Sequence, residues 1–304
     1  RTKQIKFATG VMCLPQYHPA VQAGQAAMFD HLSKGRFIMG VGPGGLASDF
    51  ELFGVMDKDR MEMMEEALEM MIELWTTEPP YKMHGKHWTI DMKEWTHHDI
   101  KLGYVPKPYQ DPYPPVAISA MSPHSGSLKF AGSKGYIPVS ANFVATWSVE
   151  THWPAYCEGA KTGGITPNPE NWRVARSIYV ADTDQEAEEF VKSPGGAYDY
   201  YYEYLFQIFE RSDYKAPFVA NPNDDPAKLT PQGIRDACTI YGSPETVANK
   251  IMELRKRIGD FGTVLYAAHD WQDKGAMKKS MTMFAEEVMP RVNSKLDSKQ
   301  ASAG

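Results

Sequence analysis

Apolar positions along the chain form two kinds of pattern that follow each other in turn. Short continuous apolar runs predict buried strands at residues 5–13, 36–41, 116–120, 136–140, 172–181 and 262–267. Stretches with apolar residues three and four apart predict amphipathic helices at residues 19–32, 59–75, 127–134, 149–161, 184–191, 244–258 and 277–289. Strands that alternate with helices of this length predict a parallel α/β fold.

Three segments interrupt this alternation. Residues 81–90 predict a β-hairpin, and residues 193–236 form an irregular, aromatic stretch that we expect to be an insertion or lid with a helix around 200–211. Residues 294–304 are polar and predict a frayed C-terminal tail. No stretch has the composition of a linker, so we expect residues 1–293 to form a single domain.

The aromatic side chains of the predicted insertion have two interpretations. They line an apolar substrate pocket beneath a lid, or they pack a dimer interface, and the pattern favours neither. These residues are Tyr198, Tyr200, Tyr201, Tyr202, Tyr204, Phe206 and Phe209.

Composition narrows the class of protein. The 304 residues carry 38 acidic and 32 basic side chains, a formal net charge of −6, and 42% of them are hydrophobic, which is typical of a globular chain. The acidic balance and the lack of a basic run argue against a nucleic-acid partner. No apolar run approaches the roughly 20 residues that cross a bilayer, so we expect no membrane association. Cys13, Cys157 and Cys238 lack CxxC spacing, which favours a cytoplasmic location over a disulfide framework.

Two clusters of small residues follow predicted strands. Residues 122–126 read SPHSG at the start of a predicted helix, where backbone N–H groups and hydroxyls suit a phosphate, although an ordinary N-cap explains them equally well. Residues 42–45 read GPGG, which lets the backbone approach a cofactor but also serves a plain strand-to-helix turn. The second cluster is not a dinucleotide fingerprint, because no helix follows at once.

Two histidines stand next to predicted element ends. His18 lies at a helix start, where capping and packing explain it and a role in a functional site is the alternative. His269 follows the last predicted strand, ahead of Asp270 and Trp271. No HxH or HExxH spacing occurs, so we expect no metal.

The chain resembles the flavin-dependent luciferase-like monooxygenase family along nearly its whole length. The motifs that carry the resemblance are LPQYHP (14–19), AAMFDHLSKGRFIMGVGPG (26–44), SDFELFG (48–54), RMEMMEEALEMMIELW (60–75), PKPYQDPYPPVAISAMSPHSG (106–126), YGSPETVANKI (241–251), FGTVLYAAHDW (261–271) and FAEEVMPRV (284–292). Within the family, SPHSG, HDW and EEVMPR are most similar to the limonene-monooxygenase-type branch.

The resemblance implies a fold and a cofactor. The implied fold is a (β/α)₈ TIM barrel that binds reduced FMN at the C-terminal ends of its strands, usually as a homodimer, and uses it to activate O₂. A non-prolyl cis peptide is implied between Gly10 and Val11, with the flavin ring against that strand end. Many family members carry a basic residue where Pro43 stands, which implies one phosphate contact fewer here.

The resemblance also implies particular site residues. The FMN-binding residues are Gly10, Val11, Gly42, Gly44, Ser122, His124, Ser125 and Gly126. The catalytic candidates are His269 and His18, and the substrate pocket is walled by Asp270 and Trp271, with Asp270 orienting His269.

The start of the sequence carries a separate expectation. In the family the LPxxHP segment follows the third strand, so the resemblance implies that this sequence begins at the third βα unit. Two units of roughly 30 residues each are then missing from the barrel, which would expose strand edges that natural proteins avoid. We therefore expect that the sequence is truncated ahead of Arg1, or that a partner supplies the missing strands.

The function we expect is FMN-dependent monooxygenation of a small apolar substrate, such as a terpene, an aldehyde or a ketone. A separate flavin reductase is expected to supply FMNH₂, and O₂ is the second substrate. Two alternatives remain open: a deazaflavin-dependent hydride-transfer enzyme on the same barrel, and a non-catalytic flavin-binding relative.

Overall fold

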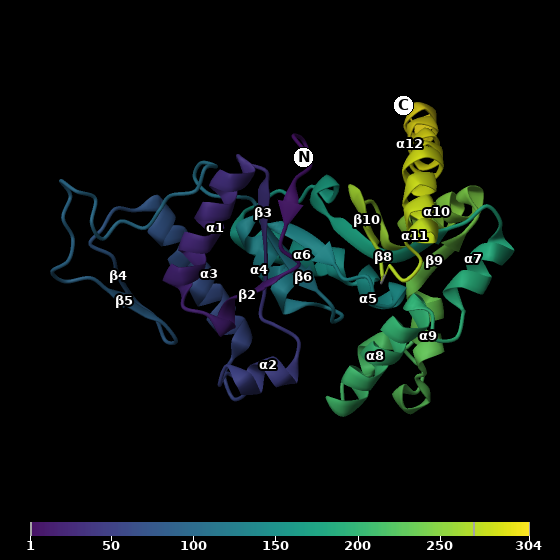
Figure 1. The fold of residues 1–304 in the computed structure, drawn as a ribbon, viewed down its shortest axis with the longest axis horizontal. Helices are drawn as coiled ribbons and strands as arrows, with labels where there is room; N and C mark the ends of the chain where they lie inside the picture. The colour runs from purple at the N-terminus through teal and green to yellow at the C-terminus, as the bar shows by residue number, and fades with distance from the viewer. Residues whose placement is uncertain (1, 270, 304) are drawn as a thin grey trace. The chain divides into compact units, whose positions relative to one another are not determined.

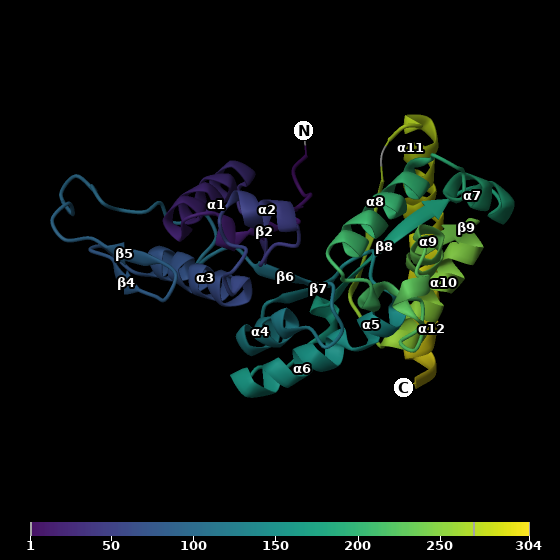
Figure 2. The same cartoon turned by 90° about the horizontal axis from the view of Figure 1, so that it is seen from below.

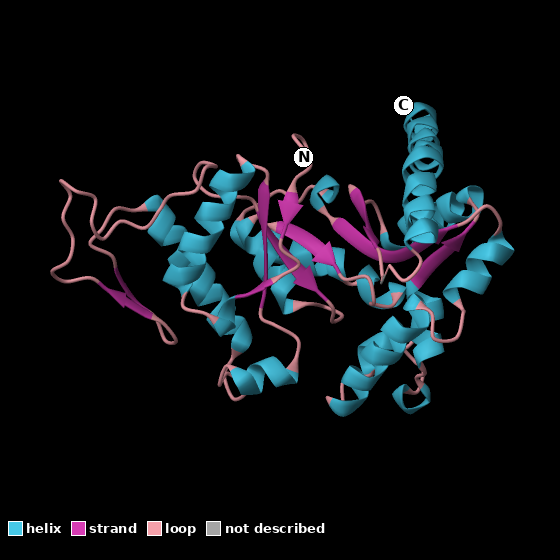
Figure 3. Cartoon of the chain, in the orientation of Figure 1, coloured by secondary structure: helices cyan, strands magenta, loops and turns pink. Residues whose placement is uncertain are grey.

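The computed structural model describes residues 2–269 and 271–303. These residues form two compact units, divided between Ser119 and Ala120, and each unit is described by itself. In both units helices separate successive strands that pair in parallel (Figures 1 and 3). The predicted parallel α/β arrangement is confirmed.

The sheet of the first unit is built around β3 (Phe37–Gly42). Strands β1 (Phe7–Ala8) and β2 (Met12–Cys13) both pair with one edge of β3, and β6 (Val116–Ala120) pairs with its other edge. Because β3 lies between neighbours, five of its six residues are buried.

The strand predicted at residues 5–13 is two short strands in the structure. Between them the register advances from residue 8 to 12 on one side but only from 38 to 41 along β3, so one extra residue bulges out of the ladder. Within the bulge Thr9 donates a hydrogen bond from Oγ1 to the Gly40 carbonyl (2.7 Å). A Cβ on Gly40 would overlap the Thr9 carbonyl, so only glycine permits this approach.

The helices of the first unit are α1 (Pro19–Ser33), α2 (Ala47–Leu52) and α3 (Arg60–Thr76), with a 3₁₀ turn at Leu14–Gln16 ahead of α1. The Asp59 carboxylate accepts hydrogen bonds from the first free N–H groups of α3, which is why this helix begins where the pattern predicts. The indole Nε1 of Trp75 donates to the Ala23 carbonyl (3.2 Å) and joins α3 to α1.

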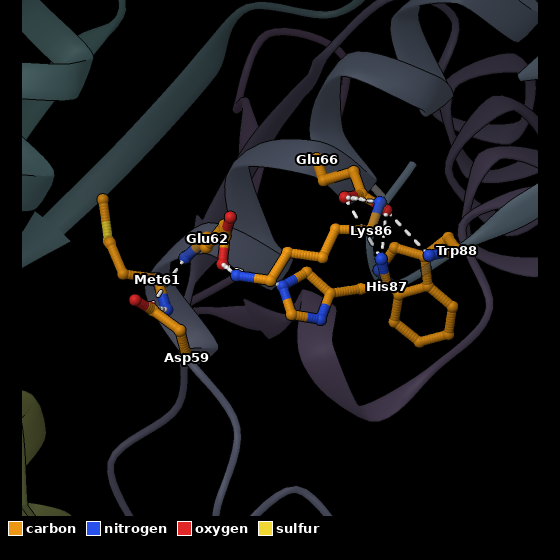
Figure 4. Close-up of polar contacts among 7 residues, drawn as sticks. All are labelled: Asp59, Met61, Glu62, Glu66, Lys86, His87 and Trp88. Atoms are coloured by element: carbon orange, nitrogen blue, oxygen red, sulfur yellow. Dashed lines mark hydrogen bonds and ion pairs between the residues drawn. The ribbon is translucent and has the colours of Figure 1, made fainter. Parts of the chain in front are cut away.

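The predicted hairpin consists of β4 (Lys82–His84) and β5 (Thr89–Asp91), which pair antiparallel. Its turn is held on α3 by the carboxylate of Glu66, as Figure 4 shows. Backbone N–H groups of three successive turn residues, Lys86, His87 and Trp88, donate to this carboxylate at 2.8, 3.0 and 2.7 Å. Charge-assisted bonds of this kind are stronger than neutral ones, so Glu66 fixes the conformation of the turn.

The sheet of the second unit is built around β8 (Arg173–Val180). The first residues of β8 pair with β7 (Ile137–Ser140), residues 173–177 pair with β10 (Thr263–Ala267), and residues 177–180 pair with β9 (Thr239–Gly242). Strand β9 was not predicted, and it pairs with the second half of β8 while β10 pairs with the first half.

The helices of the second unit follow the predicted order with two differences. The helix predicted at 149–161 is two helices, and helical structure continues past residue 294 to Ala303. The helices are α4 (Gly126–Lys134), α5 (Thr146–Glu150), α6 (His152–Gly163), α7 (Asp184–Val191), α8 (Ala197–Arg211), α9 (Pro231–Cys238), α10 (Pro244–Ile258), α11 (Lys274–Met283) and α12 (Met289–Ala303), with 3₁₀ turns at Pro169–Asn171, Ala216–Phe218 and Pro226–Lys228.

The C-terminal helices form one rod, drawn in yellow in Figures 1 and 2. A π-helical turn (Phe284–Val288) joins α11 to α12 without a break. Glu245 of α10 pairs with Arg291 (3.5 Å) and Lys295 (2.9 Å) of α12. These two ion pairs join the first turns of α12 to α10. The predicted fraying of the tail from residue 294 stays a prediction.

Helices α4 and α6 lie side by side at unusually close range (Figures 1 and 2). A Cβ on Gly159 of α6 would overlap the Lys129 carbonyl of α4, and a Cβ on Gly132 of α4 would overlap the Tyr156 carbonyl of α6. Glycine at these positions lets the two backbones touch. The N-terminal residues of both helices border the turn at residues 122–126, which is predicted to hold a phosphate.

The described part of the chain has no helix with the length and apolar character that a membrane crossing requires.

We expect Gly159→Ala to destabilise the second unit by about 1–3 kcal/mol, because the added methyl group must push α6 away from α4. Gly24→Ala is the matched control, since Gly24 also lies inside a helix but a Cβ there meets nothing within 4 Å. This control should gain roughly 0.5–1 kcal/mol from helix propensity. Urea denaturation of both variants measures the difference, and equal midpoints would contradict the close-contact argument.

We expect Glu66→Gln to loosen the hairpin turn, because a neutral amide accepts these hydrogen bonds more weakly than a carboxylate does. Hydrogen exchange at the amides of Lys86, His87 and Trp88 should become about tenfold faster, which corresponds to ~1.4 kcal/mol. Glu73→Gln, on the exposed end of the same helix, serves as the control and should leave these amides unchanged. Unchanged exchange in Glu66→Gln would show that the turn holds without the carboxylate.

Candidate functional site

In the first unit, three of the predicted cofactor-binding residues lie together at the ends of β2 and β3. The peptide bond between Gly10 and Val11 is cis, as the resemblance implies. Cys13 pairs with Gly42, which brings Val11 beside Gly42: a Cβ on Gly42 would lie 2.9 Å from the Val11 Cγ2 atom. A Cβ on Gly10 would meet nothing within 4 Å, so the backbone there is open on that side.

Gly44 has a different local role. Its φ of +88° is one that L side chains rarely adopt, and a Cβ there would lie 2.9 Å from the Phe50 ring. Phe50 is buried and carries the Arg60 guanidinium 4.0 Å from its ring centroid. Gly44 therefore permits the turn and the packing of α2 beneath it, and its predicted contact with FMN stays a prediction.

His18 is the N-cap of α1. Its Nδ1 accepts a hydrogen bond from the Ala20 N–H (3.2 Å), and its ring meets Trp88 of the hairpin edge-on with ring centroids 5.8 Å apart. These contacts are those of a capping and packing residue, the first of the two interpretations that the sequence allowed. Its candidate catalytic role stays a prediction.

In the second unit, Ser122, His124, Ser125 and Gly126 form one turn between β6 and α4, with His124 in the left-handed region at φ +50°. Two residues at the start of α6 hold this turn. The His124 N–H donates to Thr151 Oγ1 (2.7 Å), and His152 Nε2 donates to the Ser122 carbonyl (3.1 Å). The close contact of α4 with α6 thus fixes the conformation of the turn.

His152 belongs to a fully buried hydrogen-bonded chain. Trp172 Nε1 donates to Ser140 Oγ (3.0 Å), and Ser140 Oγ lies 2.9 Å from His152 Nδ1. The Ser122 carbonyl can only accept, so His152 Nε2 carries a hydrogen, and in the neutral ring Nδ1 then accepts from Ser140. Burial lowers the pKa of His152 to about 4, and the nearby Arg176 charge contributes to the shift.

The start of α4 fits an anionic group. Ser125 is the N-cap residue, but its side chain bonds Ser127 Oγ (2.8 Å) instead of capping a helix N–H. A Cβ on Gly126 would meet nothing within 4 Å, so the approach to the helix N-terminus is open. A helix N-terminus attracts negative charge, so the start of α4 suits an anionic group. The predicted contact of these residues with the FMN phosphate stays a prediction.

His269 lies in a second buried cluster of the same unit, next to β8. Its Nε2 is 3.0 Å from Ser177 Oγ, and its ring packs against Tyr198 and Tyr201 of α8, with ring centroids 4.6 and 4.1 Å away. Only 8% of His269 is exposed. Of the residues predicted beside it, Trp271 is 44% exposed, and Asp270 lies outside the described residues.

The aromatic residues of the predicted insertion divide between two faces of α8. Tyr198, Tyr202 and Phe209 are buried, and Tyr198 OH donates to the Ile178 carbonyl of β8 (2.7 Å). Tyr200 and Tyr204 are exposed and stack on each other, with ring centroids 6.4 Å apart. The first face packs on β8 and His269, and both interpretations of the aromatic residues stay predictions.

Several residues of these clusters were not predicted from the sequence. The available signal was a polar pair, Arg176-Ser177, in the middle of an otherwise apolar strand. Ser177 is the partner of His269, and Arg176 is fully buried, with Nη1 donating to the Ala175 carbonyl (3.0 Å). Among the described residues, Arg176 Nη2 has no hydrogen-bond partner, and burial lowers the pKa of this side chain.

A cavity of about 490 Å³ lies elsewhere in the second unit, lined by residues 219–233. None of the predicted site residues lines it. Within the described ranges, no group of three or more His, Cys, Asp or Glu side chains is placed to hold a metal ion.

Comparison with known proteins gives the class of this one. The family model of luciferase-like monooxygenases matches residues 1–260 of this chain. The 3,6-diketocamphane 1,6-monooxygenase of Pseudomonas putida is 29% identical, with 96% of this chain and 81% of that protein covered. Limonene 1,2-monooxygenase of Rhodococcus erythropolis is 30% identical, with 97% of this chain and 71% of that protein covered.

A solved structure agrees with these relatives. It is the oxygenating constituent of 3,6-diketocamphane monooxygenase from Pseudomonas putida, a type II Baeyer-Villiger monooxygenase in complex with FMN. The two structures align with a TM-score of 0.82 at 30% identity, over 96% of this chain and 80% of that one. The fold is therefore of the luciferase-like (β/α)₈ barrel class, as predicted.

The chain belongs to the luciferase-like monooxygenase family and is an oxidoreductase of that kind. The predicted family and enzyme class are confirmed. The roles of the individual site residues, and the two βα units expected ahead of Arg1, stay predictions.

We expect the stability of the protein to fall as the pH drops from 6.5 to about 4, with His152 contributing about 3 kcal/mol to the loss. The folded state keeps His152 neutral over this range while the unfolded state takes up a proton, so acid favours unfolding. Urea denaturation at several pH values should show a flatter dependence in His152→Phe, although this variant is less stable at pH 7. The exposed His84→Gln serves as the control, and an equal slope in His152→Phe would assign the acid sensitivity to other groups.

Proposed function

We propose that this protein is an FMN-dependent monooxygenase that takes FMNH₂ from a separate flavin reductase and uses O₂ to oxygenate a small apolar terpenoid, with cyclic ketones as the first candidates. The observation that carries the proposal is the alignment, at 30% identity and over 96% of the chain, with an FMN complex of a ketone-oxygenating relative. Limonene 1,2-monooxygenase, a relative at 30% identity, is named for a terpene.

Each unit, taken by itself, offers one feature that suits a part of FMN. In the first unit, the open backbone at Gly10 and the close packing of Val11 on Gly42 offer a flat surface for a ring system. In the second unit, the uncapped start of α4 and the open space at Gly126 offer a place for a phosphate. When bound, reduced FMN would supply the electrons that activate O₂, and the protein would bind it, orient it and exclude water.

The buried cluster around His269 fits an apolar substrate with one polar group. Tyr198 and Tyr201 of α8 pack against the imidazole and keep the surroundings dry, and His269 offers a hydrogen-bonding ring within them. Ligand sites of this kind combine apolar walls with few polar groups that fix orientation. We propose that His269 meets the oxygen of the substrate.

Two further features belong to the same proposal. All three cysteines are free thiols, which supports the predicted cytoplasmic location. The homodimer implied by the resemblance is part of the proposal, and light scattering of the purified protein tests it.

The reaction is tested with the full chain, an FMN reductase, NADH and a panel of cyclic terpenoid ketones under ¹⁸O₂. We expect one ¹⁸O atom in the product by mass spectrometry, and no product when FMNH₂ is replaced by a reduced deazaflavin. Turnover with the deazaflavin but not with FMNH₂ would favour the hydride-transfer alternative. Stoichiometric FMN binding with no turnover on any substrate would favour a non-catalytic relative.

We expect Gly126→Asp to weaken FMN binding by about tenfold or more, because it puts a carboxylate at the helix N-terminus that would hold the phosphate. The variant should fold, since the space at Gly126 is open and an acidic residue suits a helix start. Gly126→Asn is the matched neutral control. Fluorescence titration should show the loss for FMN but not for riboflavin, which lacks the phosphate, and equal losses for both flavins would remove the phosphate from this turn.

A further inference from the structure

The cavity of about 490 Å³ in the second unit belongs to the segment that joins α8 to α9. The two helices contact each other (Figure 1), and every lining residue lies within residues 219–233. Ligand sites have volumes of roughly 300–1,000 Å³, so this cavity is large enough to hold a small molecule.

Hydrogen bonds hold the walls of the cavity in place. Trp147 of α5 donates from its indole Nε1 to the carbonyl of Val219 (2.8 Å), which is a lining residue. Thr230 caps α9 by accepting from the N–H of Gly233 (3.1 Å), and both of these residues also line the cavity. The walls are therefore formed before any ligand arrives, as is usual for small-molecule sites.

The lining combines an apolar side with a cation. Val219 is buried, and Leu229 packs against the aromatic core cluster of α8 and α9. Asp224 and Asp225 accept hydrogen bonds from backbone N–H groups of their own segment. The ammonium group of Lys228 has no hydrogen-bond or ion-pair partner within the described part of the chain. Such a lining suits a compound with an apolar body and one oxygen that accepts a hydrogen bond.

Three phenylalanine rings lie directly behind the cavity wall. Phe218, the residue before Val219, is fully buried and lies flat against Phe209 of α8, with ring centroids 3.6 Å apart and planes 4° apart. Phe143, in the segment after β7, packs against both rings at 6.0 and 6.1 Å. These rings make no hydrogen bonds, so moving them apart breaks none.

The three rings connect the cavity to the cluster around His269. Phe143 follows Asn142, whose Nδ2 donates to the Ser177 hydroxyl and to Tyr201 OH, both at 3.1 Å. Ser177 and Tyr201 are the residues that contact His269. A continuous series of contacts therefore runs from the cavity wall to His269, and its only movable part is apolar.

We propose that this cavity is an entry site for the substrate, and that Phe218 determines the size of the compound that passes on to His269. The inference rests on the proposed function for the class of compound, a small apolar ketone, and for the place of His269. Lys228 donates a hydrogen bond to the ketone oxygen, and Val219 and Leu229 contact the apolar body.

Binding to the cavity is tested in the full chain without flavin, with camphor, a bicyclic terpenoid ketone, as the probe. The indole N–H signals of the seven tryptophans are followed by ¹⁵N–¹H spectroscopy, and the signal that disappears in Trp147→Phe belongs to Trp147. We expect camphor to shift this signal until it saturates, and to leave unchanged the signal of Trp172, which is bonded to Ser140. A Trp147 signal that camphor does not shift would overturn the proposal.

A variant that fills the cavity locates the bound ketone. Ala220 is an exposed lining residue, so Ala220→Phe should fold and should weaken camphor binding by about tenfold or more. Ala227→Phe is the matched control, because Ala227 is exposed on the same segment but does not line the cavity. Equal affinities in the Ala220→Phe and Ala227→Phe variants would place the ketone elsewhere and contradict the proposal.

Passage to His269 is tested by the size of the substrate. Phe218→Leu keeps an apolar side chain but removes the ring, so kcat/KM for a tricyclic ketone should rise about tenfold relative to camphor. The affinity for FMN should stay at the wild-type value. Phe190→Leu is the control, since Phe190 is also stacked, on Tyr179 at 4.0 Å, but lines neither the cavity nor the path. An unchanged ratio in Phe218→Leu would rule out the role of Phe218.

If no ketone is turned over, the proposed function fails and passage is measured by binding alone. In ¹⁵N-histidine spectra, the ring signal that disappears in His269→Gln belongs to His269. The tricyclic ketone should shift this signal in Phe218→Leu but not in the wild-type protein. The same response in both proteins would overturn the proposal.

Discussion

The second unit depends on one constraint: β8 is buried along almost its whole length, yet it carries a polar pair at its centre. A buried hydroxyl without partners costs about 1–3 kcal/mol, so the fold must bring partners to Ser177. They come from the segment after β7, from α8 and from the residue two places beyond β10. Satisfying this hydroxyl therefore places the aromatic helix and the candidate catalytic histidine together.

The turn at residues 122–126, which is predicted to hold a phosphate, is also fixed by contacts between elements. Helices α4 and α6 approach closely because glycines line their contact, and this approach puts Thr151 and His152 against the turn at residues 122–126. His152 in turn is buried neutral, held by Ser140. Both clusters of the unit are thus hydrogen-bonded networks with fully buried groups at their centres, Ser140 and His152 in one and Ser177 in the other.

Much of the fold could be predicted, because apolar periodicity is a local signal. Strand β6 and helices α7 and α10 have the predicted bounds, and the cis bond at Gly10 follows from the resemblance. Strand β9 was missed, since its four residues follow α9 directly and carry no alternation of their own. The continuation of the last predicted helix into α12 was missed, because the Glu245 carboxylate that pairs with Lys295 lies on α10, 50 residues earlier in the chain.

By itself the sequence determined the order of the elements and the family. It also indicated which glycines and histidines are candidate site residues. Only the tertiary structure decided which polar groups meet: Ser177 lies 35 residues from Asn142 and 92 from His269 in the chain. A hydrophobic pattern states that a residue is buried, but a buried polar group needs a particular partner with a particular direction. That information exists only once the strands have paired and set the register.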